Sequence, residues 1–200
     1  DVIDFYFIHW PDPHTPIAET MSALNLLKSL GKIRFLGVSN FTQEQIEEAE
    51  KYARIDVMQL QYSMVHQKHK VLIEWGSQRG IDTFTYGSLG AGILSGKFRT
   101  LPPLKPGDTR ITFYDYFKEP KFSKIQNVLQ VMDEIAACHQ ASVSQVAINW
   151  CTQSPGVSTA LIGMSKPAHV RQNCDAFAWQ LSDDEMTCLD AAMEREKIAD

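Results

Sequence analysis

The sequence has no long hydrophobic run and no surplus of positive charge. No apolar stretch in its 200 residues reaches the roughly 18 residues that a membrane-spanning helix needs. Lysine and arginine number 19 against 24 aspartates and glutamates, which leaves a formal net charge of -5 at pH 7. Nucleic-acid-binding proteins usually carry a surplus or a stripe of basic residues, so the negative net charge argues against a nucleic-acid-binding function. We therefore expect neither a membrane span nor a nucleic-acid partner.

Closely spaced cysteines are absent as well. The four cysteines (Cys138, Cys151, Cys174 and Cys188) include no C-x-x-C pair of the kind that zinc and redox sites commonly use. Most of them lie among apolar neighbours in the sequence, so we expect buried free thiols rather than a metal site. Free thiols persist in a reducing compartment, which makes the cytoplasm the expected location.

Short apolar runs alternate with amphipathic segments along most of the chain. The apolar runs predict strands, and the helical spacing of apolar residues between them predicts helices. The predicted strands are residues 4–9, 33–38, 55–62, 81–86 and 159–163. The first run (DFYFIH) is almost continuously apolar, which is typical of a strand that is buried on both faces.

Capping residues mark where the predicted helices begin. Thr15 followed by Pro16 predicts an N-cap with proline at the first helical position. Capping boxes, in which a hydroxyl residue precedes a glutamine or glutamate by three positions, begin at Thr42, Ser142 and Ser182. The sequence therefore predicts the starts of four helices.

Residues 87–121 break this alternation, because they contain five glycines and four prolines. We expect a long loop there, and loops of that length in compact domains are usually either functional or disordered. The loop includes an aromatic cluster, Phe113, Tyr114, Tyr116 and Phe117. Closure over a substrate and simple packing are equally good interpretations of this cluster.

Five strand–helix units predict an α/β fold with a parallel sheet. None of the turns after the predicted strands has the G-x-G-x-x-G pattern of a dinucleotide-binding Rossmann sheet. The absence favours a (β/α)8 TIM barrel, whose functional side chains gather at the carboxyl ends of the strands. A complete barrel takes eight units and typically about 250 residues. We therefore expect residues 1–200 to form a single, incomplete barrel domain with about five units.

Five blocks of sequence resemble the aldo/keto reductase superfamily. They are DFYFIHWPDP (4–13), GKIRFLGVSNF (31–41), QLQYS (59–63), YGSLG with LSGKF (86–98) and LIGMSKPAHVRQN (161–173). They occur in the family's order and cover nearly the whole chain. The resemblance implies a barrel reductase that uses a nicotinamide dinucleotide without a Rossmann fold. It also implies that residues 4–9 correspond to the fourth barrel strand, so we expect the chain to be the C-terminal portion of a longer protein.

The resemblance places His9 beside the reactive carbonyl and makes Trp10 a wall of the substrate pocket. A neutral imidazole can donate a hydrogen bond to a carbonyl oxygen on which charge develops. The family's catalytic tyrosine, lysine and aspartate have no counterparts that we can assign in this chain, so we expect little turnover from these residues alone. A structural role is the alternative for His9 and for Trp10.

The resemblance also implies a site for NADP(H). Ser39, Asn40 and Gln59 match the residues that hold the nicotinamide carboxamide, whose C=O and NH2 groups an amide and a hydroxyl can pair. Tyr86 matches the aromatic residue that stacks on the nicotinamide ring. Turn or core positions are the structural alternatives for these residues. The matches near the phosphates and the adenine are Gly87, Ser88, Leu89, Lys97, Gly163, Ser165, Lys166, Gln172 and Asn173.

Two features of this second group suit phosphate binding. The segment Gly87–Lys97 forms a glycine-rich turn, and the turn after the fifth predicted strand leads into a helix N-terminus, which favours anions. Lys166 matches part of a clamp on the adenosine 2′-phosphate, where its charge favours NADP over NAD; a solvated helix surface is the alternative. The pattern departs from the family at Gln172, where glutamate is usual, and at His169, where glutamine or arginine is usual.

Two other functions compete with a carbonyl reductase. The chain also resembles the regulatory β-subunits of potassium channels, which would make it a non-catalytic nicotinamide-binding module. His9 weighs against that interpretation, because a binding module has no need of its imidazole. A metal-dependent hydrolase is weaker still, because such barrels need several ligands at strand ends. The expected partner is a small-molecule aldehyde or ketone, sugar-derived compounds included.

Overall fold

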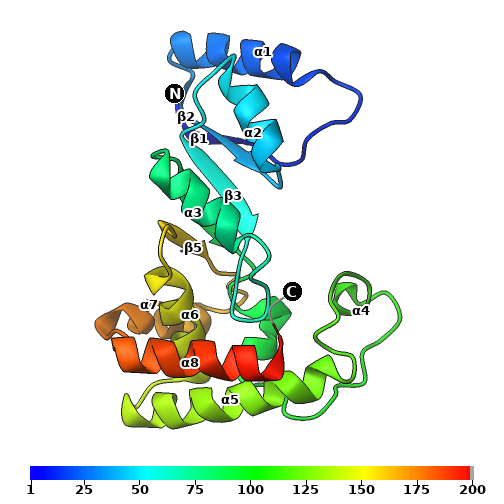
Figure 1. Ribbon diagram of the computed structural model, residues 1–200, viewed down its shortest axis with the longest axis vertical. Helices are drawn as coiled ribbons and strands as arrows, with labels where there is room; N and C mark the ends of the chain where they lie inside the picture. Colours follow the sequence, from blue (N-terminus) through cyan, green and yellow to red (C-terminus); the bar gives the residue numbers. More distant parts are fainter. Residues whose placement is uncertain (199–200) are drawn as a thin grey trace. The chain divides into compact units, whose positions relative to one another are not determined.

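The computed structural model describes residues 1–198, which form an α/β fold around one five-stranded sheet (Figure 1). The strands lie in sequence order, β1-β2-β3-β4-β5, and both β1 with β2 and β2 with β3 are parallel. The strand bounds are β1 (Ile3–Ile8), β2 (Ile33–Ser39), β3 (Val57–Gln61), β4 (Asp82–Tyr86) and β5 (Thr159–Leu161). All five predicted strands are therefore present, and the α/β class is confirmed.

Helices follow each strand in the chain. The first three are α1 (Ile17–Ser29), α2 (Gln43–Glu50) and α3 (Lys70–Gln78). Between β4 and β5 lie η1 (Gly90–Ser95), α4 (Thr109–Phe113), α5 (Lys121–Cys138) and α6 (Val143–Gln153). After β5 come α7 (Pro167–Cys174), η2 (Asp175–Ala178) and α8 (Asp183–Glu196). Within residues 1–198, no helix has the length and apolar character that crossing a membrane requires.

The chain divides into two compact units, each with its own core. Unit 1 comprises residues 1–61, 69–85 and 155–159, and unit 2 comprises residues 62–68, 86–154 and 160–200. The core of unit 1 includes Leu36, Val38, Ile46 and Ile55, which are fully buried. The core of unit 2 is built where α5 packs on α6 and α8, with Ile125, Leu129, Val146 and Leu189 among its fully buried side chains.

The sheet of unit 1 is strongly curved, as expected of a barrel wall. The rings of Phe5 in β1 and Phe84 in β4 lie 5.2 Å apart, although β2 and β3 separate their strands. Neighbouring strands are about 4.8 Å apart, so these two strands would be about 14 Å apart in a flat sheet. Phe7 also lies near Phe84, with ring centroids 6.0 Å apart, and Gly37 leaves room for the Phe7 ring, because a Cβ there would come within 2.4 Å of it.

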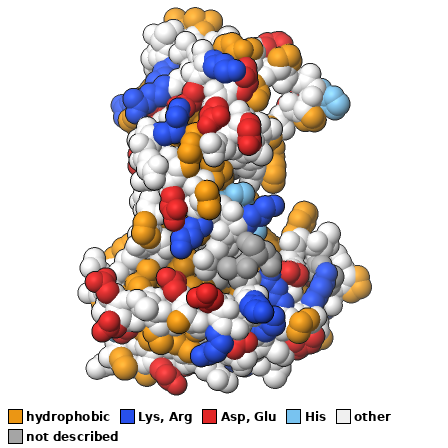
Figure 2. Space-filling view, in the orientation of Figure 1, with side chains coloured by type: hydrophobic (Ala, Val, Ile, Leu, Met, Phe, Trp, Pro, Cys, Tyr) orange, Lys and Arg blue, Asp and Glu red, His pale blue; other side chains and the backbone are white. Residues whose placement is uncertain are grey.

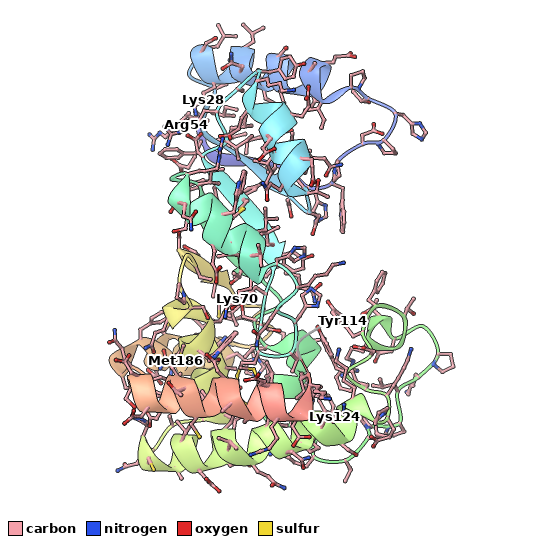
Figure 3. The ribbon with its side chains drawn as sticks, viewed as in Figure 1. Lys28, Arg54, Lys70, Tyr114, Lys124 and Met186 are labelled. Carbon is pink, nitrogen blue, oxygen red and sulfur yellow. The ribbon has the colours of Figure 1, made fainter. Side chains whose placement is uncertain are left out.

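A half-buried carboxylate joins α1 to the sheet of unit 1. Asp56 Oδ2 accepts hydrogen bonds from Lys28 Nζ at 2.5 Å and from the backbone N–H of Leu36 at 2.9 Å. Arg54 Nε lies 3.7 Å from the other carboxylate oxygen. Figure 3 shows Lys28 and Arg54 on the same side of this unit. The three side chains fix the amino end of β3 beside β2.

The three predicted capping boxes are present. They begin α2, α6 and α8, at Thr42, Ser142 and Ser182 respectively. In each box the hydroxyl of the capping residue accepts a hydrogen bond from the backbone N–H of the third helical residue. The side chain of that third residue in turn accepts a hydrogen bond from the backbone N–H of the capping residue. This exchange satisfies two N–H groups that have no partner within the helix. Local sequence alone therefore determined where these helices begin.

Two local expectations in unit 1 are wrong. Thr15 does not cap α1, because its hydroxyl donates to Asp12 Oδ2 at 2.8 Å and the helix begins at Ile17 without a side-chain cap. Strand β1 is not buried on both faces, since Phe5 and Tyr6 are 43% and 41% exposed. Within residues 1–198, β1 pairs with β2 only, and this leaves part of its apolar surface exposed.

The expectation of buried thiols is confirmed only for Cys151. That residue is buried in α6, with Sγ 3.8 Å from Tyr62 O and 3.6 Å from Ser88 Oγ. Cys138, Cys174 and Cys188 are free but exposed. Apolar neighbours in the sequence misled this prediction, because successive residues of a helix point to different faces.

Candidate functional site

The carboxyl ends of β1, β2 and β3 carry a hydrogen-bonded polar cluster in unit 1. Asn40 Nδ2 donates to the backbone oxygen of His9 at 3.0 Å and to Ser39 Oγ at 3.1 Å. Ser39 Oγ in turn donates to the backbone oxygen of Gln59 at 3.0 Å. The same carbonyl accepts from the backbone N–H of Asn40 at 3.3 Å. Four of the predicted site residues are therefore held together by one network, which we call the strand-end cluster.

The conformation of Asn40 explains how the cluster forms. Its φ is 61°, in the left-handed region that asparagine enters more readily than most residues. This turn ends β2 and directs the chain toward the Thr42 cap of α2. It also places the Asn40 amide between the end of β1, at His9, and the end of β2, at Ser39. Ser39 itself is only 1% exposed. A hydroxyl and an amide thus lie side by side on a rigid support.

His9 joins this network through its backbone, not through its ring. The imidazole is exposed, and its centroid lies 5.9 Å from that of Trp10. Trp10 lines a small pocket of about 100 Å³ beside α1. The other lining residues are Ile8, Pro11, Asp12, Thr15, Ile17, Thr20, Met21 and Phe41. The pocket is mainly apolar, with a few polar groups.

Asp12 gives this pocket a negative charge. The backbone N–H of His14 donates to one carboxylate oxygen at 2.9 Å, and the Thr15 hydroxyl donates to the other. These bonds stabilise the ionised form and lower the pKa of Asp12 below its usual value of 3.8. The pocket therefore presents a carboxylate at neutral pH, which repels anions.

A second cavity, of about 280 Å³, lies in unit 2. Residues 87–89, 91, 92 and 161–163 line it, so Gly87, Ser88, Leu89 and Gly163 are brought together as lining residues. Three successive residues, Gly90, Ala91 and Gly92, have left-handed φ values of 54°, 54° and 90°. Three glycines, Gly87, Gly92 and Gly163, therefore line the cavity beside the apolar residues Leu89, Leu161 and Ile162, and at the glycines no side chain covers the backbone. Such a surface suits a close approach by phosphate groups.

Tyr86 lies at the start of this loop and is half-buried. Burial, together with the nearby Tyr114 phenol, raises the pKa of Tyr86 above its usual value of 10.0. The side chain is therefore uncharged at physiological pH and offers a neutral aromatic surface. The next serine, Ser88, is buried against Cys151.

The other predicted cofactor residues do not line this cavity. Lys97 Nζ lies over the Phe98 ring, 5.5 Å from its centroid. Ser165 and Lys166 are exposed, and Lys166 is the N-cap residue of α7. Within α7, the backbone oxygen of Gln172 accepts a hydrogen bond from Gln145 Nε2 at 2.8 Å. Asn173, next to it, is half-buried. All of these residues belong to unit 2, and Lys97, Ser165, Lys166 and Gln172 are exposed.

The structure separates the aromatic cluster of the long loop. Tyr116 and Phe117 are 2% and 7% exposed and pack in unit 2, whereas Phe113 is 74% exposed. Sequence reasoning missed Arg110, whose guanidinium lies 5.3 Å from the Phe98 ring centroid and 5.7 Å from that of Phe117. The loop is also more regular than expected, because it includes η1 and α4.

Arg110 also pairs with Asp108, its Nη2 lying 2.5 Å from Oδ2. The Arg110 side chain, followed by its backbone N–H, lowers the pKa of Asp108 to about 2. The D-x-R spacing is the signal in the sequence that could have identified this pair. Arg110 therefore anchors α4 by charge and by cation–π contacts together.

Charge is mixed on the face shown in Figure 2, where acidic and basic side chains are interspersed. In residues 1–198, no three histidine, cysteine, aspartate or glutamate side chains are grouped so as to hold a metal ion. Phosphate binding would therefore depend on local groups rather than on a broad basic surface.

Known proteins match the chain along almost all of its length. A model of the aldo/keto reductase family matches residues 1–194. The aldo-keto reductase YhdN of Bacillus subtilis is 30% identical over 196 residues, which are 97% of this chain and 59% of YhdN. The NADH-specific methylglyoxal reductase of Escherichia coli is 31% identical over 193 residues, with 94% and 58% of the two chains covered. A probable voltage-gated potassium channel subunit beta of Arabidopsis thaliana is 30% identical over 192 residues, with 88% and 56% covered.

A solved structure matches equally well. The glycerol dehydrogenase AKR11B4 of Gluconobacter oxydans superposes with a TM-score of 0.91 and 31% identity, covering 98% of this chain and 59% of that one. The chain therefore spans less than two thirds of the length of these relatives. Its five-stranded sheet matches part of their (β/α)8 barrel. Because the family model matches nearly every residue, the chain belongs to the aldo/keto reductase family.

Proposed function

We propose that the protein is an NADP(H)-dependent oxidoreductase that reduces small aldehydes or ketones to alcohols. The observation that carries this proposal is the strand-end cluster, in which Ser39, Asn40 and the Gln59 backbone are fixed by mutual hydrogen bonds. Family membership supports the oxidoreductase class. In the proposal, Ser39, Asn40 and Gln59 hold the carboxamide of the nicotinamide, and Tyr86 is assigned to its ring by its match to the family motif alone.

The chemistry divides between cofactor and protein. When bound, the reduced nicotinamide supplies the hydride, and the protein supplies orientation and hydrogen bonds. The exposed His9 imidazole donates to the carbonyl oxygen of the substrate and orients it. The hydrogen bond from Asn40 to the His9 carbonyl ties the backbone at this position to the strand-end cluster. In this proposal the phosphates lie at the cavity of unit 2, where Gly87, Gly92 and Gly163 have no side chain to block a close approach to the backbone.

The cofactor preference rests on the predicted residues of unit 2 that do not line the cavity. We assign Lys97 to the pyrophosphate, Ser165 and Lys166 to the 2′-phosphate, and Gln172 and Asn173 to the adenine. A lysine that meets the 2′-phosphate dianion favours NADP over NAD. One matched relative is named as NADH-specific, so this preference belongs to the individual protein and has to be measured.

The pocket beside Trp10 supports small and uncharged substrates. Its volume of about 100 Å³ is less than that of a cavity of about 150 Å³, which holds benzene. The ionised Asp12 on its wall disfavours substrates with a carboxylate. Short-chain aldehydes and ketones, including small sugar-derived ones, meet both conditions.

We further propose that these 200 residues bind the cofactor but turn over little substrate by themselves. A general acid must protonate the carbonyl oxygen, and we assign no tyrosine of the chain to that role. Tyr6 lies in the middle of β1, and Tyr86 is assigned to ring stacking. In this proposal the chain corresponds to the family's barrel from its fourth strand onward. The compartment remains a prediction, and the cytoplasm is still the one we expect.

Titration of the purified chain with NADPH and NADH, followed by tryptophan fluorescence, tests the proposal. We expect NADPH to bind about tenfold more tightly, as one charge-assisted contact to a phosphate predicts. Lys166→Ala should weaken NADPH binding and leave NADH binding unchanged. Binding of neither nucleotide would contradict the function, and equal binding would contradict the NADP preference. Rapid NADPH oxidation with methylglyoxal would contradict the expected lack of turnover.

A regulatory nicotinamide-binding module is the second candidate, and the matched potassium channel subunit favours it. Binding of NADPH alone does not separate the two functions. Hydride transfer by the whole protein separates them, because only a reductase has to orient the carbonyl group of a substrate. A whole protein that loses reductase activity on His9→Ala is an enzyme, and one that binds NADPH but reduces no carbonyl compound is a binding module.

A further inference from the structure

We propose that three side-chain amides on α6 position residues 172–181, and with them the adenine end of the cofactor site. Gln145, Asn149 and Gln153 make up this row, which we call the amide ladder. The inference rests on the proposed function, because it assigns the ladder's purpose to the nucleotide that the site would bind. None of the three was singled out by the family motifs. The ladder residues are positioning residues, because they act through the segment they hold.

The ladder follows from helical geometry. Its members are spaced four residues apart, so they lie on one face of α6. Gln145 and Asn149 are only 7% and 2% exposed. Buried amides are costly unless each finds a hydrogen-bond partner. All three find theirs in one segment, which runs from the end of α7 to the start of α8.

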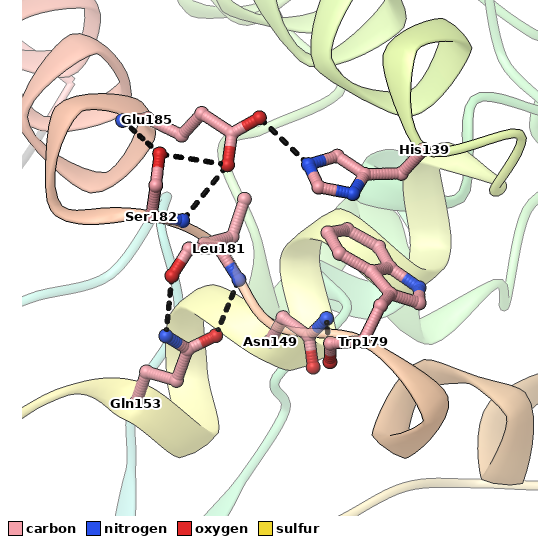
Figure 4. Close-up of polar contacts among 7 residues, drawn as sticks. All are labelled: His139, Asn149, Gln153, Trp179, Leu181, Ser182 and Glu185. Carbon is pink, nitrogen blue, oxygen red and sulfur yellow. Dashed lines mark hydrogen bonds and ion pairs between the residues drawn. The ribbon is translucent and has the colours of Figure 1, made fainter.

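Each amide binds the backbone of that segment. Gln145 Nε2 donates to Gln172 O at 2.8 Å, and Asn149 Nδ2 donates to Trp179 O at 3.2 Å. Gln153 makes a pair of bonds to Leu181: its Nε2 donates to the carbonyl and its Oε1 accepts from the N–H, both at 2.9 Å. Figure 4 shows the side-chain amides of Asn149 and Gln153 facing this segment. The amide ladder therefore provides hydrogen-bond partners for backbone groups of a segment that belongs to no sheet.

Helix α7 depends on these bonds because it has little other anchorage. None of its side chains is buried. The next apolar anchor is Ala176 in η2, which is completely buried. The far end is held more firmly, since the His139 ring stacks on Trp179 at 4.2 Å and His139 Nε2 lies 2.7 Å from Glu185 Oε1 (Figure 4). Gln145 is the member of the ladder that acts on α7 itself.

Gln145 performs two tasks with one side chain. Its Oε1 accepts from the backbone N–H of Ser142 at 2.8 Å, which completes the capping box of α6, while its Nε2 holds Gln172. In unit 1, Gln45 completes the same kind of capping box for α2. Within the described residues, no hydrogen bond from Gln45 to a second helix is found. Both glutamines therefore complete a capping box, but only Gln145 is found to donate a hydrogen bond to a second helix within the described residues.

This difference allows a test aimed at the bond to Gln172 O, in which a carboxylate oxygen that the carbonyl repels replaces the donating N–H. Gln145→Glu keeps the acceptor oxygen of the capping box, where glutamate is a common residue, but loses the N–H that donates to Gln172 O. Gln45→Glu is the matched control. Gln153→Glu is a second variant, at a half-exposed position, that loses the bond to Leu181 O alone.

Two measurements on the full chain separate positioning from stability. Adenosine 2′,5′-bisphosphate probes the adenine end, and nicotinamide mononucleotide probes the opposite end. We expect Gln145→Glu to bind the bisphosphate about tenfold more weakly, as loss of a buried hydrogen bond implies, with unchanged binding of the mononucleotide. Hydrogen exchange over residues 167–178 should quicken in the same variant. Gln153→Glu should act in the same direction and more weakly, and Gln45→Glu should change neither measurement.

The outcomes distinguish this inference from the proposed function. If wild-type protein binds no bisphosphate, the proposed cofactor is wrong and the ladder's assignment to it falls as well. If wild-type protein binds it and Gln145→Glu binds it equally well, only the positioning role is overturned. Equal weakening of both probes would also overturn that role, because it would indicate a general loss of structure.

Discussion

The strand-end cluster of unit 1 and the glycine-rich loop of unit 2 present polar groups in opposite ways. In unit 1, side chains from strand ends bond to one another, and Ser39 is almost wholly buried. In unit 2, the backbone takes left-handed conformations around a cavity, and the nearby lysines are exposed. A carboxamide needs donors and acceptors at fixed positions, whereas phosphates need a close approach to backbone. Substitutions should therefore act through lost hydrogen bonds in unit 1 and through backbone strain in unit 2.

The largest effect should come from adding a side chain to the loop of unit 2. Gly90 has a φ of 54°, and a Cβ there would lie 2.7 Å from Val65 Cγ2. Gly90→Ala combines left-handed strain with overpacking, so we expect a loss of about 3 kcal/mol in the free energy of unfolding. Gly107→Ala is the control, because its φ is 89° and nothing lies within 4 Å of the added Cβ. Equal losses in urea denaturation would contradict the packing argument.

A smaller effect is expected at Asn40 in unit 1. Asn40→Ala removes the bonds to His9 and Ser39 and leaves alanine at a φ of 61°, so we expect a loss of about 1–3 kcal/mol. Asn40→Gly loses the same bonds but tolerates the backbone, and it should cost less. Denaturation of both variants separates the two contributions. If glycine costs as much as alanine, the left-handed backbone is unimportant and only the side chain matters.

A modest gain in stability is expected next in the loop. Ala91 has a φ of 54°, which is unfavourable for an alanine. Ala91→Gly should raise the free energy of unfolding by about 0.5–1 kcal/mol because it removes this strain. Ala191→Gly, at an exposed position inside α8, should lower the same quantity by a similar amount. A loss of stability in Ala91→Gly would show that the loop does not depend on left-handed strain.

The smallest effect should be the pH dependence of the loop anchor. The pKa of Asp108 is about 2 in the folded chain against a usual 3.8, because Arg110 stabilises the ionised carboxylate. The stabilisation is therefore complete above about pH 4 and is lost as the pH falls toward 2. Thermal unfolding of wild type and Asp108→Asn should differ at pH 6 by a small margin that disappears below pH 2. A difference that grows with acidity would have the wrong sign.

Much of the fold could be predicted because its signals are local. Capping boxes at Thr42, Ser142 and Ser182 join residues three apart, and those contacts form in any context that permits a helix. The strands follow from their apolar runs. Thr15 shows the limit of such signals, because its hydroxyl has a competing partner in Asp12 that the capping pattern does not include.

Less of the candidate site could be predicted from the residues. Residues 39–41 (SNF) identified Ser39 and Asn40 only because they resemble a family motif. No pattern in the sequence showed that the Asn40 side chain would bind the backbone of His9. The amide ladder left no motif, because Gln145 and Gln172 are 27 positions apart. Periodicity describes the face of a helix on which a residue lies, and it does not identify what covers that face.

By itself, the sequence determined the order of strands and helices, the starts of three helices and the family. These depend on interactions within a turn of helix or along one strand, which the local order of residues encodes. The tertiary structure decided which side chains of β1 are exposed within residues 1–198, that three cysteines are exposed, and which backbone carbonyl each amide of α6 meets. Those outcomes depend on which distant segments pack together, because burial and hydrogen-bond partners are properties of the assembled chain.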